Sequence, residues 1–373
     1  MRIAIVVSNY SLGGAEAHAL KLAKYFKNDK DFEVEYWVFS FGDGVTKLIC
    51  EENNIPTRQL TEFRSFKRFP RSLRHIGHYV KFVRQFKPNV VMSFNVLPNI
   101  WNGVISNFSG VKLSIWSQQS EINYSFKKPL EKFALKKIGC FLSNAHHASD
   151  KLKKSLPVKR SDKDFHVVHN GIPNQVEKEL PEYWNAKLKK DQYDFVVTMV
   201  ANLTITKDHE TLIKAWKFVV DENSDRNPLL ALAGRKGEKT EEIKQLIASL
   251  KIENNVVLLG GVLDIPGLNS SSDLGVLSSK AEGLPNSIME QMAVGLPIVG
   301  TANDGIKEVV GKEMENYLSP ISDCRGLADN INIFLRDEKL RIRIGKKSQE
   351  RINKSFSLNK MNEDTLKVID SYL

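Results

Sequence analysis

Short apolar runs alternate with longer amphipathic segments along most of the chain. A nearly continuous apolar run predicts a strand from Arg2 to Ser8, of the kind that is buried on both faces of a parallel sheet. From Ala15 to Phe26 the apolar residues recur at helical spacing, and the loop before them ends in Gly13-Gly14. A strand, a glycine-containing loop and a helix in this order are typical of the start of a doubly wound α/β domain.

This alternation continues along the chain, pauses near residue 172 and restarts near residue 195. Further strands are expected at 34–39, 90–94, 113–116 and 165–168, and then at 195–200, 229–233, 256–259, 273–277 and 297–299. Further helices are expected at 45–54, 70–86, 97–108, 127–138 and 146–155, and then at 208–221, 239–251, 285–294 and 324–337. Strands that alternate with helices favour parallel sheets covered on both faces. We therefore predict an α/β fold with two Rossmann-like, doubly wound domains that face each other across a cleft.

A polar stretch divides the two domains. Residues 173–194 contain two prolines and many charged residues, so we interpret them as a linker with a short helix. The linker separates an N-terminal domain at 1–172 from a C-terminal domain at 195–354. The tail is largely helical, and its last part, about 355–373, is long enough to cross back to the first domain.

The composition favours a globular protein of the cytoplasm. The chain has 373 residues, 42% of them hydrophobic and 26% charged, which is enough for two ordinary domains. No apolar run approaches the ~18 residues that a membrane span needs, and the N-terminus enters a strand without a signal-peptide pattern. The three cysteines are far apart and lack metal-ligand spacing, so we expect them to be buried thiols.

Basic residues are concentrated in the first half of the chain. Residues 1–180 contain 28 Lys and Arg against 16 Asp and Glu, whereas the remainder contains 26 against 28. The segment 63–87 has eight basic residues, six interleaved aromatic residues and no acid. Such a segment is typical of contact with an anionic membrane surface, of a solvated helix face whose aromatic residues enter the core, or of nucleic-acid binding. We favour the membrane surface, and hence a peripheral location at the inner face of the plasma membrane with no nucleic acid as partner.

The stretch AEGLPNSIMEQMAVGLP at 281–297 carries the clearest sign of a binding site. It follows an expected strand, and a helix is predicted to begin near Pro285, because proline is favoured in the first helical turn. The start of a helix has unpaired backbone N–H groups and a partial positive charge, which suit a phosphate. Carboxylates on either side suit sugar hydroxyls, which donate hydrogen bonds. The residues expected to contact a donor here are Glu282, Gly283, Leu284, Asn286, Ser287 and Glu290.

Other loops at strand ends in the second domain complete a site suited to a nucleoside diphosphate sugar. Lys207 would neutralise the diphosphate as it leaves. Glu282 and Glu290 would accept hydrogen bonds from the transferred sugar and from the ribose, respectively. The backbone of Val262 and Leu263 could read the base.

The chain resembles the retaining glycosyltransferases of family 4, which have the GT-B fold and transfer sugars from nucleotide donors. The resemblance rests on Glu282 and Glu290 as an E-x7-E motif, on Lys207 in TKDHETLIKA, on HNGIP at 169–173 and on GGAE at 13–16. It implies transfer with retention, in which the leaving phosphate helps to remove the proton of the attacking hydroxyl. It also implies that no metal or other cofactor is needed, because Lys or Arg takes the place of a metal ion.

Three positions depart from the family pattern. Asn202 and Arg235 are both expected to bind the donor. Asn202 stands where the family usually has an arginine, five residues before Lys207, and Arg235 after the next strand could supply the second cation. Gln119 stands near the place of a histidine that contacts the transferred sugar, and an amide does not titrate near neutral pH. The usual G-D-G or G-x-G after the second strand of the second domain is GRKG at 234–237.

The resemblance implies that the first domain holds the acceptor. Parallel sheets of this kind bind ligands at the carboxyl ends of their strands, which directs attention to the loops at 13–14, 94–95, 118–121 and 169–171. Within these loops and the first helix, the residues expected at the site are Gly14 for the donor, Gln119 for the reacting sugar, and Gly13, His18 and Glu121 for the acceptor.

The sequence thus predicts a metal-independent hexosyltransferase of bacterial surface polysaccharide synthesis. The donor is expected to be a nucleotide diphosphate sugar, a UDP-sugar by preference, that carries a hexose or N-acetylhexosamine. The basic first domain favours a glycan acceptor linked to polyprenyl diphosphate, and a soluble acceptor stays open if segment 63–87 is ordinary surface. Two other classes also stay open: a nucleotide-sugar epimerase of related fold and a non-catalytic protein that binds a nucleotide sugar.

Overall fold

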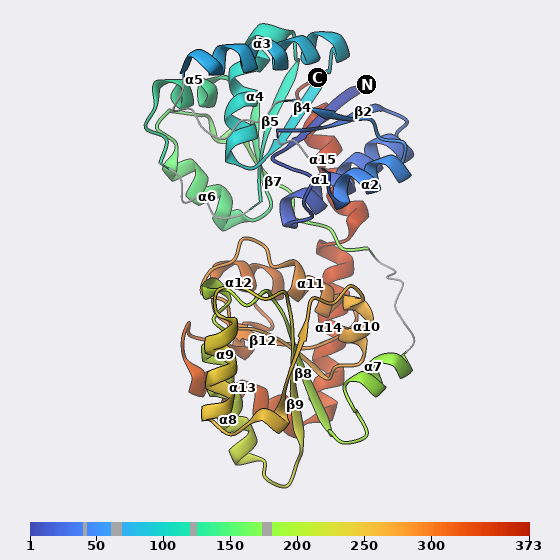
Figure 1. Cartoon of the computed structure of the whole chain (residues 1–373), viewed down its shortest axis with the longest axis vertical. Helices are drawn as coiled ribbons and strands as arrows, with labels where there is room; N and C mark the ends of the chain where they lie inside the picture. Colours follow the sequence, from blue (N-terminus) through green and yellow to red (C-terminus); the bar gives the residue numbers. More distant parts are fainter. Residues whose placement is uncertain (40–42, 61–68, 120–124, 174–180) are drawn as a thin grey trace. The chain divides into compact units, whose positions relative to one another are not determined.

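The computed structural model describes residues 1–39, 43–60, 69–119, 125–173 and 181–373 (Figure 1). The chain divides into two compact units, the first made of residues 1–170 and 361–373 and the second of residues 171–360. Each unit is built on one parallel sheet with flanking helices. The predicted fold class, two doubly wound α/β domains, is confirmed.

The first unit contains a seven-stranded sheet with the order β3-β2-β1-β4-β5-β6-β7. Its strands are β1 Arg2–Val7, β2 Glu33–Val38, β3 Thr57–Gln59, β4 Val90–Phe94, β5 Leu113–Gln118, β6 Cys140–Ser143 and β7 Phe165–Val167. In the register, Ile3 of β1 lies opposite Val34 of β2 and Val90 of β4. The strand order reverses between β1 and β4, so the carboxyl ends of these two strands form the place where such sheets bind ligands.

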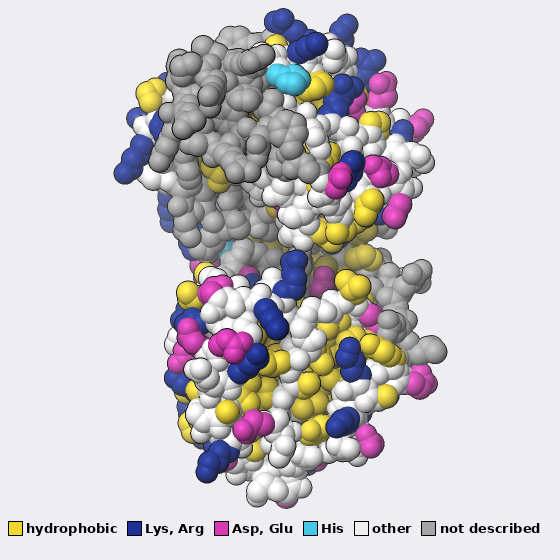
Figure 2. All heavy atoms as spheres, in the orientation of Figure 1, with side chains coloured by type: hydrophobic (Ala, Val, Ile, Leu, Met, Phe, Trp, Pro, Cys, Tyr) yellow, Lys and Arg dark blue, Asp and Glu magenta, His cyan; other side chains and the backbone are white. Residues whose placement is uncertain are grey.

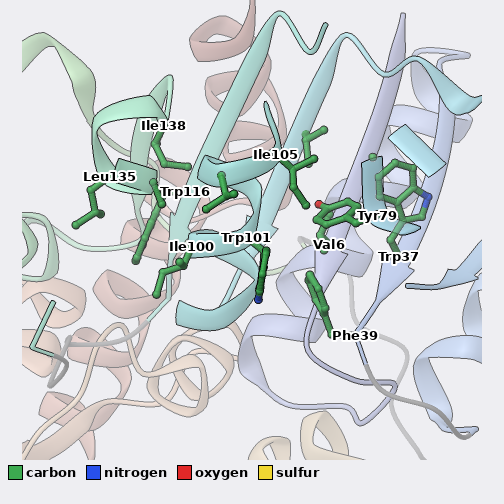
Figure 3. Close-up of a cluster of buried hydrophobic side chains, with 14 of the residues drawn as sticks. Val6, Trp37, Phe39, Tyr79, Ile100, Trp101, Ile105, Trp116, Leu135 and Ile138 are labelled. Atoms are coloured by element: carbon green, nitrogen blue, oxygen red, sulfur yellow. The ribbon is translucent and has the colours of Figure 1, made fainter. Parts of the chain in front are cut away.

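Helices and a large aromatic core cover this sheet. The helices are α1 Gly14–Lys24, α2 Val45–Glu52, α3 Phe69–Phe86, α4 Val96–Ser109, α5 Pro129–Lys137, α6 His146–Ser155 and α15 Leu358–Asp370, of which α15 begins in the second unit. Figure 3 shows part of the core, in which side chains of the strands meet those of α3, α4 and α5. Trp37 packs edge-to-face on Tyr79, with ring centroids 5.9 Å apart. Such aromatic pairs stabilise a core beyond the area that they bury.

The described part of the basic segment fits a solvated helix face whose aromatic residues enter the core. Residues 63–68 lie outside the described residues. In α3, Tyr79 is buried and Phe86 packs against the same core, while Lys81 and Arg84 are exposed. Figure 2 shows Lys and Arg side chains at the upper edge of the first unit. None of the described helices combines the length and the hydrophobicity needed to cross a bilayer.

The second unit contains a six-stranded sheet with the order β10-β9-β8-β11-β12-β13, which reverses between β8 and β11. Its strands are β8 Phe195–Val200, β9 Pro228–Ala233, β10 Val256–Gly260, β11 Leu274–Leu277, β12 Ile298–Thr301 and β13 Leu318–Ser319. Its helices are α7 Pro181–Lys187, α8 His209–Glu222, α9 Thr240–Ser249, α10 Ile265–Ser270, α11 Asn286–Ala293, α12 Asp304–Val310, α13 Cys324–Arg336 and α14 Glu338–Ser355. The carboxyl ends of β8 and β11 therefore border the place where this sheet would bind a ligand.

Part of the expected linker is packed structure. Residues 181–187 form α7, and Trp184 is buried at 2% exposure. The Trp184 indole donates a hydrogen bond to Asp264 Oδ2 at 2.7 Å, and the same carboxylate caps α10 by accepting from Gly267 N. The boundary between the two compact units lies between residues 170 and 171, before the polar stretch rather than within it.

The hydrophobic pattern did not reveal several short elements. The strands β3, β6 and β13 have only two to four residues, and α10 and α12 have six and seven. Short segments give a weak periodicity, although the strand predicted at 165–168 is observed as the three-residue β7. Cys324 also differs from the expectation of a buried thiol, because it begins α13 and is partly exposed, whereas Cys50 and Cys140 are buried.

Candidate functional site

Two loops at the carboxyl ends of β8 and β11 bring together two of the predicted site residues. Lys207 ends the turn after β8, and Glu282 lies in the loop between β11 and α11. The Lys207 Nζ and Glu282 Oε1 atoms are 2.5 Å apart, and the two side chains are 29% and 11% exposed. Because the pair is partly withdrawn from water, its charges attract each other more strongly than those of an exposed pair.

Further contacts hold these two loops together. The Ser278 hydroxyl lies 3.0 Å from the carbonyl oxygens of both Lys207 and Asp208. Lys280 N donates to Thr206 O at 2.9 Å, and Lys280 Nζ lies 3.7 Å from Asp208 Oδ1. Asp208 has a φ of 49°, in the left-handed region, where the turn ends and α8 begins. The loop after β11 therefore stabilises the loop after β8, which contains the positively charged Lys207.

The loops after β8 and β9 are joined through Asn202. Its Oδ1 atom accepts a hydrogen bond from Arg235 N at 3.0 Å, and the Arg235 side chain is exposed. Gly234 leaves room for this approach, because a Cβ atom there would lie 1.9 Å from Ala201 O. The structure therefore requires glycine at position 234, the first residue of GRKG, and the Asn202 side chain holds the backbone of the neighbouring loop through a hydrogen bond. The use of Arg235 as a second cation stays a prediction.

The helix α11 begins one residue later than the sequence suggested. Pro285 is the N-cap, with φ −73° and ψ 104°, so the first helical residue is Asn286. Asn286 and Ser287 are partly exposed in the first turn. The helix is anchored to the sheet by Gln291, a buried residue whose Nε2 donates to Thr198 O at 2.8 Å. The helix α11 is therefore fastened to β8, the strand next to β11 in the second sheet.

The loop that leads into α11 rests on the start of α12. A Cβ atom on Gly305 would lie 2.3 Å from Gly283 O, so the two loops are in close contact. Leu284 is buried beneath the loop, and Glu290 is partly exposed within α11. The predicted donor residues of this stretch thus belong to one supported loop-and-helix segment.

The loop after β10 carries the two residues predicted to read a base. Val262 is partly exposed, and the Leu263 side chain is fully exposed to solvent. Asp264, which accepts the hydrogen bonds from Trp184 and Gly267, holds the end of this loop. The contact of this loop with a base stays a prediction.

The glycines of the first unit have different surroundings. Gly13 is the N-cap of α1, and a Cβ atom on it would lie 2.7 Å from Glu16 Oε2. Around Gly14, in contrast, the space that a Cβ atom would meet is open within 4 Å. Glu16 is itself buried at 7% exposure and accepts a hydrogen bond from Asn95 Nδ2 at 3.0 Å. The GGAE motif therefore places a buried carboxylate at the end of β1.

His18 is a buried, neutral histidine. Its Nδ1 atom lies 2.5 Å from Asn170 Oδ1, an acceptor, so Nδ1 carries the proton. Burial lowers the pKa of His18 to about 4, although the nearby amides of Asn170 and Gln119 raise it. Among the described residues, no atom completes a hydrogen bond of good geometry with the buried His18 Nε2 or with the buried Gln119 Oε1. Gln119 Nε2 donates to Ser117 Oγ at 2.8 Å.

The described site residues all follow the carboxyl ends of strands in their own unit, and Lys207 with Glu282 and Asn202 with Arg235 are in contact. Glu121 lies outside the described residues. Sequence reasoning pointed to the loop at 94–95 and to the GGAE motif, but it gave no role to the residues that support these loops, which are Glu16, Asn95, Asp208, Ser278 and Lys280. Their roles depend on a positive φ or on contacts between distant loops, which a single sequence does not display. The one available signal was the position of Asn95 directly after an expected strand.

Comparisons with known proteins give a consistent picture. Residues 12–176 match the family model described as Glycosyltransferase Family 4, and residues 182–351 match the one described as Glycosyl transferases group 1. N-acetyl-alpha-D-glucosaminyl L-malate synthase of Bacillus anthracis is 29% identical over 209 residues, which are 54% of this chain and 52% of that protein. UDP-Gal:alpha-D-GlcNAc-diphosphoundecaprenol alpha-1,3-galactosyltransferase of Escherichia coli is 26% identical over 200 residues, which are 52% and 51% of the two chains. The matches span about half the length of these curated relatives.

Solved structures show the same fold over the full length. The crystal structure of Anabaena Alr3699/HepE in complex with UDP has a TM-score of 0.83, with 20% identity and all of both chains covered. A glycosyltransferase from Rickettsia africae has a TM-score of 0.84 with 17% identity, covering all of this chain and 98% of the other. At these identities the likeness speaks for the fold alone.

Proposed function

Because this chain belongs to the glycosyltransferases of family 4 and group 1, we propose that it transfers a hexose or N-acetylhexosamine from a UDP-sugar to a glycan acceptor. The observation that carries the proposal is the ion pair of Lys207 and Glu282 between the carboxyl ends of β8 and β11. The diphosphate of a donor would draw the Lys207 ammonium to itself. Glu282 would then accept a hydrogen bond from a hydroxyl of the transferred sugar.

The preference for a UDP-sugar draws on a structural relative. The Anabaena protein was solved in complex with UDP and with UDP-glucose. In this chain, Glu290 would accept from the ribose, the N–H groups at the start of α11 would face the diphosphate, and the 262–263 loop would read the base. Arg235 would add a second positive charge on the exposed side of the site.

The proposed reaction proceeds with retention at the anomeric carbon. The bond from that carbon to the diphosphate oxygen breaks, a bond to the acceptor hydroxyl oxygen forms on the same face, and the hydroxyl proton passes to the leaving phosphate. The protein supplies positioning and positive charge, mainly through Lys207. Gln119 would orient the reacting sugar, Gly14 would let the backbone approach the donor, and no metal or other cofactor is required. Activity that persists in excess EDTA, with an α-linked product by NMR, is the expected result.

The acceptor is proposed to be a glycan linked to polyprenyl diphosphate, as in bacterial surface polysaccharide synthesis. Two relatives, from Escherichia coli and Campylobacter jejuni, are named for acceptors on diphosphoundecaprenol. Gly13, His18 and Glu121 would contact this acceptor, and the basic residues of the first unit would attract an anionic bilayer. Sedimentation with liposomes tests the membrane part, and equal binding to neutral and anionic liposomes would remove it.

The central experiment is a thermal-shift screen of UDP-, GDP- and ADP-sugars followed by product analysis. A donor far above its dissociation constant should stabilise the protein by a few kcal/mol. Transfer to an added acceptor supports the proposal. Release of an isomerised sugar nucleotide would indicate an epimerase, and binding without turnover would indicate a non-catalytic protein. Absence of stabilisation by every donor would contradict the donor assignment.

A further inference from the structure

Asn95 has a strained backbone at the end of β4. Its φ of 71° and ψ of 153° fall in a region that is essentially restricted to glycine. A residue with a side chain remains in this region only when its surroundings hold it there, and such residues cluster where ligands bind. Asn95 directly follows β4 and is the N-cap of α4, and β4 lies next to β1, where the strand order of the first sheet reverses.

Two groups after β1 hold the Asn95 side chain. Its Nδ2 donates to Glu16 Oε1 at 3.0 Å and lies 3.3 Å from Ser8 Oγ. Glu16 is 7% exposed, and its carboxylate occupies the space that a side chain on Gly13 would need. The buried carboxylate therefore determines which end of the Asn95 amide it binds, namely the NH₂ group.

The opposite end of this amide is open. Asn95 Oδ1 accepts no hydrogen bond from any described residue, and it is not among the buried atoms that lack a partner. Asn95 is partly exposed, and an amide oxygen can accept a hydrogen bond from a ligand.

Two neighbouring acceptor atoms also lack partners of good geometry among the described residues. The His18 ring lies against the ring of Phe94, the residue before Asn95, with centroids 5.7 Å apart, and its Nε2 has no proton to donate. Gln119 Oε1 follows β5, the strand beside β4. Both of these atoms are buried, and the Gln119 amide is close enough to His18 to raise its pKa, so Asn95 Oδ1, on a partly exposed residue, is the acceptor that a ligand hydroxyl can reach. A fully ionised phosphate does not suit this oxygen, because it has no proton to donate.

We propose that Asn95 Oδ1 binds a hydroxyl group of the sugar acceptor and that Glu16 is the positioning residue that orients it. This proposal rests on the transferase function proposed above and adds a residue for one acceptor hydroxyl. It also explains Gly13, because only a residue without a side chain leaves room for the Glu16 carboxylate.

The test measures saccharide binding separately from donor binding. Saturation-transfer NMR with a panel of methyl hexosides and methyl N-acetylhexosaminides, in the presence of UDP, reports binding to the protein. Asn95→Gly keeps the backbone angles without strain and removes the amide, so affinity for the saccharide that binds should fall at least fivefold. Glu16→Ala should cause a similar loss, and the double variant should lose no more than either single one, because both act on one contact.

Controls separate this proposal from the donor assignment. Asn53→Ala removes one Asn side chain that donates to Ile49 O at the end of α2, and it should change saccharide binding less than twofold. Asn95→Ala replaces the glycine variant if that one does not fold. Titration of UDP should give the same dissociation constant for wild type and variants, and failure of UDP to bind the wild type would refute the proposed donor rather than Asn95.

Three results would overturn the role of Asn95 or of Glu16. Wild-type protein that binds no member of the panel removes the saccharide site. An Asn95→Gly variant that binds within twofold of wild type removes Asn95 from it. Losses that add in the double variant show that Glu16 acts independently and does not position Asn95.

Discussion

Replacement of Lys207 or of Glu282 should change UDP affinity in opposite directions. In the free protein the two side chains form an ion pair of 2.5 Å, so a diphosphate must compete with the Glu282 carboxylate for the Lys207 ammonium. Lys207→Ala removes the cation that the diphosphate needs. Glu282→Gln removes the competitor and leaves the cation in place.

The expected size follows from the partial burial of the pair. Two unit charges 4 Å apart attract by about 1 kcal/mol in water and by about 4 kcal/mol at the effective dielectric near a protein surface. Lys207 is 29% exposed, so we expect Lys207→Ala to cost about 2 kcal/mol, or ~30-fold in the dissociation constant of UDP. A partly exposed ion pair is worth at most about 1 kcal/mol, so Glu282→Gln should tighten UDP binding by up to ~5-fold.

Isothermal titration with UDP measures both changes, and transfer assays with UDP-sugars should show a loss for both variants. Lys214→Ala is the matched control, because Lys214 pairs with Glu210 at 2.6 Å on an exposed face of α8. That variant should bind UDP within twofold of wild type. Unchanged UDP affinity in Lys207→Ala, or equal weakening in Glu282→Gln, would refute the exchange of partners.

Three further predictions concern stability. Burial lowers the pKa of His18 and of His209 to about 4, so below pH 6.5 the unfolded chain binds more protons than the folded protein. The free energy of unfolding should therefore fall between about pH 6.5 and 4, by up to about 3 kcal/mol per histidine. In urea titrations, His209→Phe should show a weaker dependence of this free energy on pH, and an unchanged dependence contradicts the assignment. Gly234→Ala should lower the free energy of unfolding by at least about 2 kcal/mol, because its Cβ would meet a carbonyl oxygen, whereas Gly14→Ala should be nearly neutral. Calorimetry measures both variants, and equal midpoints of thermal unfolding would contradict the clash. Trp184→Phe removes a hydrogen bond to the cap of α10 and should cost about 1–2 kcal/mol and speed proteolysis at α7, which a wild-type cleavage rate would contradict.

The hydrophobic pattern was sufficient for the fold because its long elements carry strong periodicity. The run at 273–277 and the helix at 285–294 lie within a residue or two of the observed β11 and α11. Pro285 was placed inside the helix, whereas it caps it, because proline is compatible with both positions. Edge strands such as β13 escaped detection, since two residues cannot show a pattern.

The candidate site was only partly predictable for a different reason. Residue types and spacing pointed to Lys207 and Glu282, whose side chains are in contact. They pointed to the loop at 94–95 but not to Asp208, and they did not reveal the positive φ of either Asn95 or Asp208, because a single sequence gives no direct sign of a positive φ at a residue other than glycine. Asn202 appeared to be a missing arginine, and its partner, the backbone of Arg235, became evident only from the fold.

The hydrogen bond from Arg235 N to Asn202 limits which residues can replace Asn202. Asn202→Arg would install the arginine usual in related enzymes and at the same time remove the acceptor that fastens the neighbouring loop. Gain of charge and loss of loop geometry would then oppose each other in one step. An arginine at position 202 would therefore need a compensating change around 234–237 to keep the two loops joined.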